Sequence, residues 1–307
     1  MLPRLMCLPG KKEKFVSKNQ AKLVLFLAGI ASVMLLAAFR PLAPDTPATS
    51  NGPCVSGQCM PVGNLPGWKL IFADDFAVNV PLGQWKGCLT KPFVCGGLPA
   101  AYHAKWWAYP SGWKDTSKNG VYSPAKVLSI TNGVLDIYLH TESGSHRVAA
   151  PVPLIHGNNG PIGQRYGRYV IRFRAPSLRG YKIAWLLWPD SEVTPRDGEI
   201  DFPEGRLDGK IGAYMHHQGA TTSAEHDSFP SSVFVSSGWH TATIEWKATF
   251  VRFILDGKVL GTSTKRIPNT PMHWVIQTET DNNGLIPANS TAGHVQIDWV
   301  AVYAPGP

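Results

Sequence analysis

Residues 197–217 read DGEIDFPEGRLDGKIGAYMHH, a stretch that predicts two β-strands joined by a turn. Side chains alternate between the two faces of a strand, so Glu199 and Asp201 share one face and the apolar residues between them point to the other. Strict alternation would place Glu204 on the apolar face. One extra residue in a β-bulge would return it to the acidic face, and Pro203, which has no N–H to donate, is typical of a bulge or a sheet edge. We therefore expect all three carboxylates on one surface.

Strand patterns dominate the chain after residue 67, and no stretch there has a helical period. Apolar and polar residues alternate in RYVIRFR (168–174), TATIEW (241–246) and VQIDW (295–299). Two-residue hairpin turns are predicted where a short polar residue and a glycine separate two such segments, at Asn132-Gly133, Asp208-Gly209 and Asp256-Gly257. Many strands joined by hairpins predict one all-β domain, an antiparallel sandwich of two sheets.

Charge argues against a nucleic-acid partner. The 307 residues carry a formal charge of +8, from 29 basic and 21 acidic side chains. Residues 1–40 hold seven of the basic residues and one of the acidic ones, so this segment accounts for +6. The rest of the chain is close to neutral and has no dense basic run beyond the four arginines of 165–174, which does not favour nucleic-acid binding.

The basic N-terminus is better explained as a membrane-targeting signal. Residues 23–39 (LVLFLAGIASVMLLAAF) carry no charge and follow a lysine-rich segment at 1–22. Their length is at the short end of a bilayer span, and the lysines favour an uncleaved signal anchor with a cytoplasmic N-terminus. A cleaved signal peptide is the alternative. Residues 40–67 have the composition of a linker, so the domain at 68–307 is expected outside the cytoplasm, anchored or secreted.

Four cysteines follow the apolar segment: Cys54, Cys59, Cys88 and Cys95. They allow three pairings, and two local bridges, 54 with 59 and 88 with 95, need the least assumption. An oxidising compartment favours such disulfides. A zinc site is the alternative, but the spacings contain no C-x-x-C pair, and we expect no metal.

The three acids suggest glycoside hydrolysis. Carboxylates this close repel one another, and burying them against a core is unfavourable, so they should face water or a cleft. A retaining glycosidase needs a nucleophile and an acid/base whose carboxyl groups lie roughly 5 to 5.5 Å apart. Glu199 and Glu204 can supply these groups, while Asp201 orients the nucleophile, and the shared field should raise the pKa of one glutamate. A carboxylate metal site is a further alternative, but it lacks the Gly/Asn-rich loop of such sites.

The chain resembles glycoside hydrolase family 16, the laminarinase-like enzymes, whose bulged signature E-x-D-x-x-E stands here as Glu199, Asp201 and Glu204. Other segments follow in family order: LIFADDF (70–76), YGRYVIRFRAP (166–176), AWLLWP (184–189), WHTATIEW (239–246), ILDGK (254–258) and VQIDWVAVY (295–303). The resemblance covers nearly all of residues 68–303. It implies a β-jelly-roll with an open concave cleft that cleaves internal β-linkages of a polysaccharide with retention, a β-glucan being favoured. By position Glu199 corresponds to the nucleophile, Asp201 to the assisting acid and Glu204 to the acid/base.

The expected partners follow from this resemblance. They are a polysaccharide substrate and, if residues 23–39 are uncleaved, the membrane. We expect a monomer that requires no cofactor and binds no nucleic acid, and a structural calcium ion is left open. Two other functions stay open: a jelly roll that binds polysaccharide without cutting it, and a transglycosylase in which a sugar hydroxyl intercepts the covalent intermediate.

The substrate-binding residues are less well defined. Many family members have a W-P-A-x-W segment in the cleft, where this chain has GYKIAWLLWP, with Lys182 and Ile183 in place of Trp-Pro. The loop at 104–122 is rich in aromatic residues that could stack on sugar rings or only pack the loop. Trp185 and Trp188 lie three apart on a strand, so one of them should face the core. The candidates are Trp106, Trp107, Trp113, Trp185, Trp188, His217 and Gln277, and Glu279 is expected to be solvated.

Overall fold

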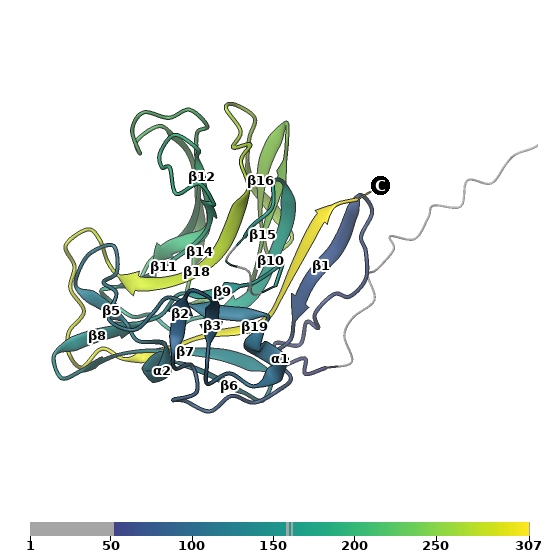
Figure 1. The fold of residues 1–307 in the computed structure, drawn as a ribbon. Helices are drawn as coiled ribbons and strands as arrows, with labels where there is room; N and C mark the ends of the chain where they lie inside the picture. Colours follow the sequence, from purple (N-terminus) through teal and green to yellow (C-terminus); the bar gives the residue numbers. More distant parts are fainter. Residues whose placement is uncertain (1–51, 158–159, 161, 307) are drawn as a thin grey trace, which may run out of the picture. The chain divides into compact units, whose positions relative to one another are not determined.

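The structure is a computed structural model that describes residues 52–157, 160 and 162–306. In this part of the chain most strands belong to two sheets, one of ten strands and one of five, and the two helices have four residues each. Figure 1 shows the two sheets as neighbouring curved layers. The prediction of an all-β sandwich is confirmed.

The larger sheet has the strand order β17-β16-β15-β10-β19-β7-β8-β5, with β1 also paired to β19 and β6 to β7. All its pairs are antiparallel except β5 with β8. Its strands are β1 (Trp68–Asp74), β5 (Gly120–Tyr122), β6 (Leu128–Thr131), β7 (Val134–Glu142), β8 (Ser145–Val148), β10 (Gly167–Arg174), β15 (His240–Lys247), β16 (Phe250–Leu255), β17 (Lys258–Ser263) and β19 (Gly293–Pro305).

The smaller sheet is antiparallel and carries the acidic motif. Its order is β14-β13-β12-β11-β18, with β12 in the centre. These strands are β11 (Tyr181–Pro189), β12 (Glu199–Arg206), β13 (Lys210–His216), β14 (His226–Phe234) and β18 (Met272–Thr280). The remaining elements are β2 (Cys88–Thr90) paired with β3 (Phe93–Cys95), β4 (Trp106–Ala108) paired with β9 (Pro151–Pro153), α1 (Ala100–His103) and α2 (Pro124–Val127).

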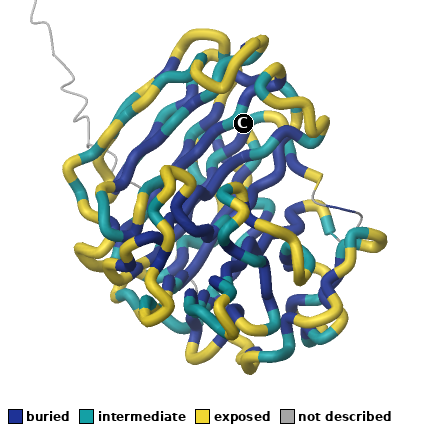
Figure 2. Tube along the Cα trace, turned by 90° about the vertical axis from the view of Figure 1, so that its left-hand side faces the viewer, coloured by how far each residue is buried: buried dark blue, intermediate teal, exposed yellow. Residues whose placement is uncertain are grey.

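The core lies between the two sheets. Edge-to-face ring pairs join one sheet to the other, with centroids 4.7 to 5.7 Å apart: Phe173 with Trp185, Tyr169 with Trp274, Phe202 with Phe253, and Phe229 with Phe253 at a more tilted angle. Such pairs add to the stabilisation that their buried area supplies. Figure 2 shows the buried strands in the interior and the exposed residues mainly in the connecting loops.

The ten-stranded sheet has a second apolar cluster on its other side, which we call the outer face. Because side chains alternate, Tyr169 and Ile171 of β10 point into the core, whereas Val170 between them joins the outer cluster with Trp299 and Tyr303. The outer face is thus the side of this sheet that is turned away from the five-stranded sheet.

Both predicted disulfides are present. Cys54 is bonded to Cys59, and Cys88 to Cys95, so the two local pairings are confirmed. The second bridge joins β2 to β3, where the two cysteines are opposite each other in the register.

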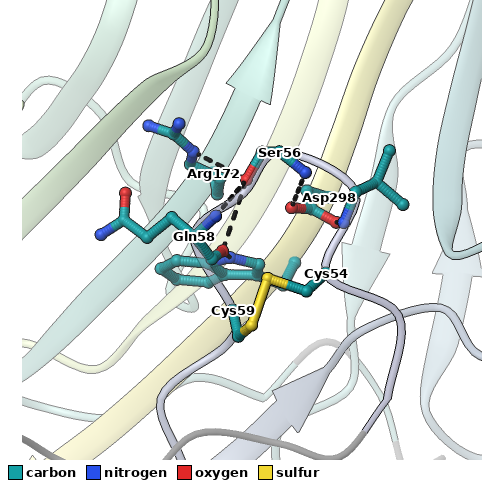
Figure 3. The surroundings of a disulfide bond; sticks show 8 residues. Cys54, Ser56, Gln58, Cys59, Arg172 and Asp298 are labelled. Atoms are coloured by element: carbon teal, nitrogen blue, oxygen red, sulfur yellow. Dashed lines mark hydrogen bonds between the residues drawn. A yellow bond between two sulfur atoms is a disulfide. The ribbon is translucent and has the colours of Figure 1, made fainter.

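The loop closed by the first disulfide lies on the outer face (Figure 3). The backbone N–H of Ser56 donates to Oδ2 of Asp298 at 2.9 Å, and the indole N–H of Trp299 donates to the carbonyl of Gln58 at 2.7 Å. Met60 is buried in the outer cluster. Residues 52–67, predicted as part of a linker, therefore pack against the domain.

Two of the three predicted hairpin turns have the expected geometry. Asn132 and Asp256 have φ values of 52° and 50°, and each is followed by a glycine with positive φ, as a type I′ turn requires. The third connection is also a hairpin turn, as predicted, but its expected two-residue form is wrong. The connection between β12 and β13 has three residues because Leu207 also belongs to it; this side chain is buried, and its N–H donates to the carbonyl of Tyr181 at 2.9 Å.

No helix in the ranges 52–157 and 162–306 is long and apolar enough to cross a membrane. The predictions for the basic segment at 1–22 and the apolar segment at 23–39 concern residues outside the described ranges.

Trp185 offers a test of the core. Its side chain is fully buried and lies edge-to-face against Phe173, so Trp185→Ala should lower the free energy of unfolding by about 3 to 5 kcal/mol in urea denaturation. Trp113 is 47% exposed and serves as the matched control, because Trp113→Ala should change that free energy by about 0.5 kcal/mol or less. Similar losses in both variants would contradict this description of the core.

Candidate active site

A β-bulge in β12 brings the three acids of the motif to one face, as predicted. Asp201 is opposite Tyr214 on β13, and Glu204 is opposite Gly212, so three steps along β12 match two along β13. The pairing with β11 shows the same extra residue. Phe202, inside the bulge, is buried in the core with 1% exposure. The bulge thus lets an apolar side chain point inward without turning Glu204 away from the other acids.

We call this side of the five-stranded sheet, which carries Glu199, Asp201 and Glu204, the acidic face. Cross-strand neighbours share a face, so the register identifies the other side chains that lie there. They include Lys182, Ala184, Leu186 and Trp188 of β11, Tyr214 and His216 of β13, and Gln277 and Glu279 of β18.

Glu199, Asp201 and His216 form a tight group. Each offers a ligand atom within 4.8 Å of the others, and Nε2 of His216 lies 3.2 Å from Oδ2 of Asp201. Burial raises the pKa of Glu199 well above its usual range, and the charge of Asp201 adds to this effect. Burial likewise raises the pKa of Asp201, followed by the charge of Glu204. The two hydrogen-bonded carboxyls therefore retain a shared proton at pH values where ordinary carboxyls are ionised.

Glu204 has a different environment because a lysine faces it. Nζ of Lys182 lies 3.1 Å from Oε1 of Glu204 and 3.9 Å from Oε2 of Glu279. Burial would lower the pKa of Lys182, but the two carboxylates outweigh this effect, so its pKa is raised and the side chain stays cationic. The sequence did not predict the ion pair between Lys182 and Glu204, although Lys182 stands out as a departure from the W-P-A-x-W pattern.

Glu279 was expected to be solvated, and this prediction is wrong. Its exposure is 0%. Oε1 accepts hydrogen bonds from the N–H and hydroxyl of Thr116, at 2.9 and 2.7 Å, and from the hydroxyl of Tyr122 at 3.0 Å. Alternation on β18 correctly separates Glu279 from its core-facing neighbours. The segment that carries Thr116 and Tyr122 nevertheless covers its side chain. The pattern of a strand does not show which other segment packs on its face.

Three of the tryptophans proposed for sugar stacking have no open ring face. Trp106, Trp107 and Trp185 are 0%, 2% and 0% exposed, so this prediction is wrong for them. The indole N–H groups of Trp106 and Trp107 donate to Asp74 and to the carbonyl of Leu89. They are part of the core, which is the common use of large aromatic side chains.

Two tryptophans remain accessible. Trp113 is 47% exposed, and its ring lies 5.6 Å from that of Tyr109. Leu187 is opposite Ile200, so the next residue, Trp188, lies beside Glu199 on the acidic face. Trp188 is partly exposed there, and its indole N–H donates to Glu192 at 2.8 Å.

His216, and not His217, lies on the acidic face. His216 is opposite Glu199 in the register, whereas Nε2 of His217 lies 3.2 Å from Oδ1 of Asp227 on β14. The prediction for His217 is wrong. Pairing β12 with β13 residue by residue from the bulge places His216 opposite Glu199 and would have identified it. Gln277 is partly buried on the acidic face, opposite Ala184.

Comparison with known proteins agrees with this arrangement. The profile of Glycosyl hydrolases family 16 matches residues 162–301, which include the whole acidic motif. These residues are similar to a family 16 domain. The chain is 24% identical over 271 residues to glucan endo-1,3-beta-glucosidase A1 of Niallia circulans, an alignment that covers 78% of this chain and 38% of the length of that relative. The resemblance inferred from the sequence is thus confirmed.

Solved structures extend the likeness in the fold. The laminarinase of Rhodothermus marinus has 22% identity and a TM-score of 0.61 over 78% of this chain and 98% of its own. LamA of Z. galactanivorans, solved in complex with laminaritriose and laminaritetraose, has 20% identity and a TM-score of 0.55 over 76% of this chain and 98% of its own. Because 78% of the chain is longer than residues 162–301, the fold shared with this laminarinase also includes strands before residue 162.

The raised pKa of Asp201 predicts how stability depends on pH. In the unfolded chain this carboxyl ionises near pH 3.9, whereas the folded protein keeps the proton to higher pH. The folded state therefore binds more protons in that window, and the contribution of Asp201 to stability falls as pH rises through it. Asp201→Asn should be more stable than wild type at pH 7, and the difference should shrink towards pH 4.

Urea denaturation at pH 4, 5.5 and 7 measures this effect. Glu245→Gln is the control, because Glu245 lies outside the acidic face and pairs with Arg168, so its loss should give no gain in stability at pH 7. A difference between Asp201→Asn and wild type that is constant over this pH range would refute the prediction.

Proposed function

We propose that this protein is a retaining, endo-acting glycoside hydrolase that cleaves internal β-linkages of a glucan. The observation that carries the proposal is the bulge in β12, because it sets Glu204 on the same face as Glu199 and Asp201. Two carboxyl groups that flank one glycosidic bond supply the chemistry of this reaction.

The first step would form a covalent intermediate. Protonated Glu204 donates its proton to the glycosidic oxygen, while a carboxylate oxygen of Glu199 attacks the anomeric carbon. The bond from the anomeric carbon to the leaving sugar breaks, and a glycosyl ester of Glu199 forms. In the second step Glu204, now a carboxylate, takes a proton from water, whose oxygen attacks the anomeric carbon and releases Glu199.

Asp201 would keep the nucleophile ready for this attack. Glu199 has to be ionised, although the pair holds a proton at unusually high pH. Asp201 is only 3% exposed, so the shared proton is best assigned to it, where it can be donated in a hydrogen bond to the Glu199 carboxylate. His216, 3.2 Å from Asp201, would hold the remaining oxygen in place.

The substrate class is suggested by the relatives. One is described as a glucan endo-1,3-beta-glucosidase, and another is described as a laminarinase. Trp188 beside Glu199 and the exposed Trp113 provide aromatic surface for sugar rings. Laminarin, a β-1,3-glucan, is therefore the first substrate to test, with mixed-linkage glucan and galactan beside it.

Substitution of either glutamate should abolish the reaction. Glu199→Gln and Glu204→Gln should each lower kcat on laminarin by at least about 10²-fold, because one loses the nucleophile and the other the proton donor. Release of reducing ends measures the rate. Glu245→Gln, a glutamate away from the acidic face, should keep wild-type activity.

The products distinguish this function from its alternatives. Wild type should first release sugars of retained anomeric configuration, seen by ¹H NMR, and early inversion would refute double displacement. A chain that binds laminarin without releasing reducing ends would be a binding module, and products longer than the substrate would indicate transglycosylation.

We also propose that catalysis needs no metal ion and takes place outside the cytoplasm. Two carboxyls suffice for the chemistry, and the two disulfides suit an oxidising compartment. Activity on laminarin should therefore survive dialysis against EDTA. Loss that Ca²⁺ restores would instead indicate a cation requirement, for which Glu199, Asp201 and His216 are the candidate ligands in the described residues.

A further inference from the structure

We propose that Lys182 is a positioning residue for Glu204, and that it exchanges its ion pair between Glu204 and Glu279 as Glu204 loses and gains its catalytic proton. The inference rests on the proposed function, in which Glu204 changes its protonation state twice in each cycle.

Lys182 lies between two carboxyl groups on neighbouring strands. β11 runs between β12, which carries Glu204, and β18, which carries Glu279, and Lys182 is directly opposite Glu279 in the register. Its Nζ is 3.1 Å from Glu204 and 3.9 Å from Glu279. Lys182 is 7% exposed, so water offers little alternative when one partner is lost. A cation in this position needs a carboxylate beside it at every stage of the reaction.

Glu279 has an oxygen free for this purpose. Its Oε1 is fixed by Thr116 and Tyr122, which set the orientation of the carboxyl group. Its Oε2 is buried and accepts no hydrogen bond from any described residue. Buried polar atoms are nearly always paired, so an orphan oxygen beside an ammonium group calls for an explanation. A shift of Nζ by about 1 Å would bring it to the length of a charged hydrogen bond.

The exchange fits the catalytic cycle. When Glu204 has given up its proton, its carboxylate attracts Lys182, which is the arrangement seen here. When Glu204 is protonated again, this attraction is lost and Lys182 moves to Oε2 of Glu279. Protonation raises the net charge of this group by one, and the lysine keeps a counterion because Glu279 takes over from Glu204.

Other charged groups also face Glu204 and must be held constant in a test. Asp201 and Arg206 lie on its own strand, Tyr214 lies on β13, and Asp281 lies just beyond β18. Most of them line a cavity of about 360 Å³ together with Lys182 and Glu204. Lys210 supplies a matched control, since it lines the same cavity but its ammonium group lies over the ring of Phe234.

The test compares the pH dependence of kcat/KM on laminarin, whose alkaline limb reports the loss of the catalytic acid. Lys182→Met removes the cation that favours the Glu204 carboxylate, so the limb should move to higher pH by roughly 1 unit or more. Glu279→Gln removes the second carboxylate beside Lys182, so the cation acts on Glu204 alone. The alkaline limb of the pH profile should then move to lower pH. Lys182→Arg and Lys210→Met should keep the wild-type limb.

A second measurement needs no substrate. The carboxyl of Glu204 can be titrated by ¹³C NMR, and the Glu204→Gln variant assigns its signal. The midpoint of this titration should be lowest in Glu279→Gln, intermediate in wild type and highest in Lys182→Met. Limbs and midpoints that stay at the wild-type values, or that shift in the same direction in both variants, would overturn the inference. A wild-type protein that is inactive on every glucan would instead overturn the proposed function, while the NMR order would still decide the role of Lys182.

Discussion

The site depends on one extra residue in the central strand of the smaller sheet. β12 must pack Ile200 and Phe202 into the core and also present three acids on its opposite side. A regular strand cannot do both over the length of this motif, because its period is two. The bulge between Asp201 and Glu204 resolves the conflict, and the core holds it in place from both neighbouring strands. Packing and chemistry are thus determined by the same local irregularity.

The acidic face keeps its carboxyl groups in two different settings. Glu199 and Asp201 are hydrogen-bonded to each other in a buried position, where they share a proton and meet His216. Glu204 and Glu279 lie on either side of Lys182. Repulsion among clustered acids is reduced by protonation in the first case and by a cation in the second. One sheet therefore holds its carboxyl groups in two different electrostatic environments.

Sequence patterns predicted the features that depend on local geometry. Strand alternation, the turns at Asn132-Gly133 and Asp256-Gly257, the bulge and both disulfides are all present. The patterns failed where the outcome depends on what another segment covers. Trp106 and Trp107 lie in the short strand β4, which packs into the core, and Glu279 is covered by the loop of Thr116. Alternation separates the two faces of a strand, but it does not say which segment packs on either face.

The disulfide loop at 54–59 determines where the chain enters the domain. Its contacts with Asp298 and Trp299 hold the first described residues against the outer face of the ten-stranded sheet. The acidic motif lies on the far side of the other sheet, with the entire core between. Whatever precedes Gly52 is therefore joined to the domain at its back. The acidic face is therefore clear of the segment through which the chain enters the domain, which leaves that face open along its length for the polymeric substrate that we propose.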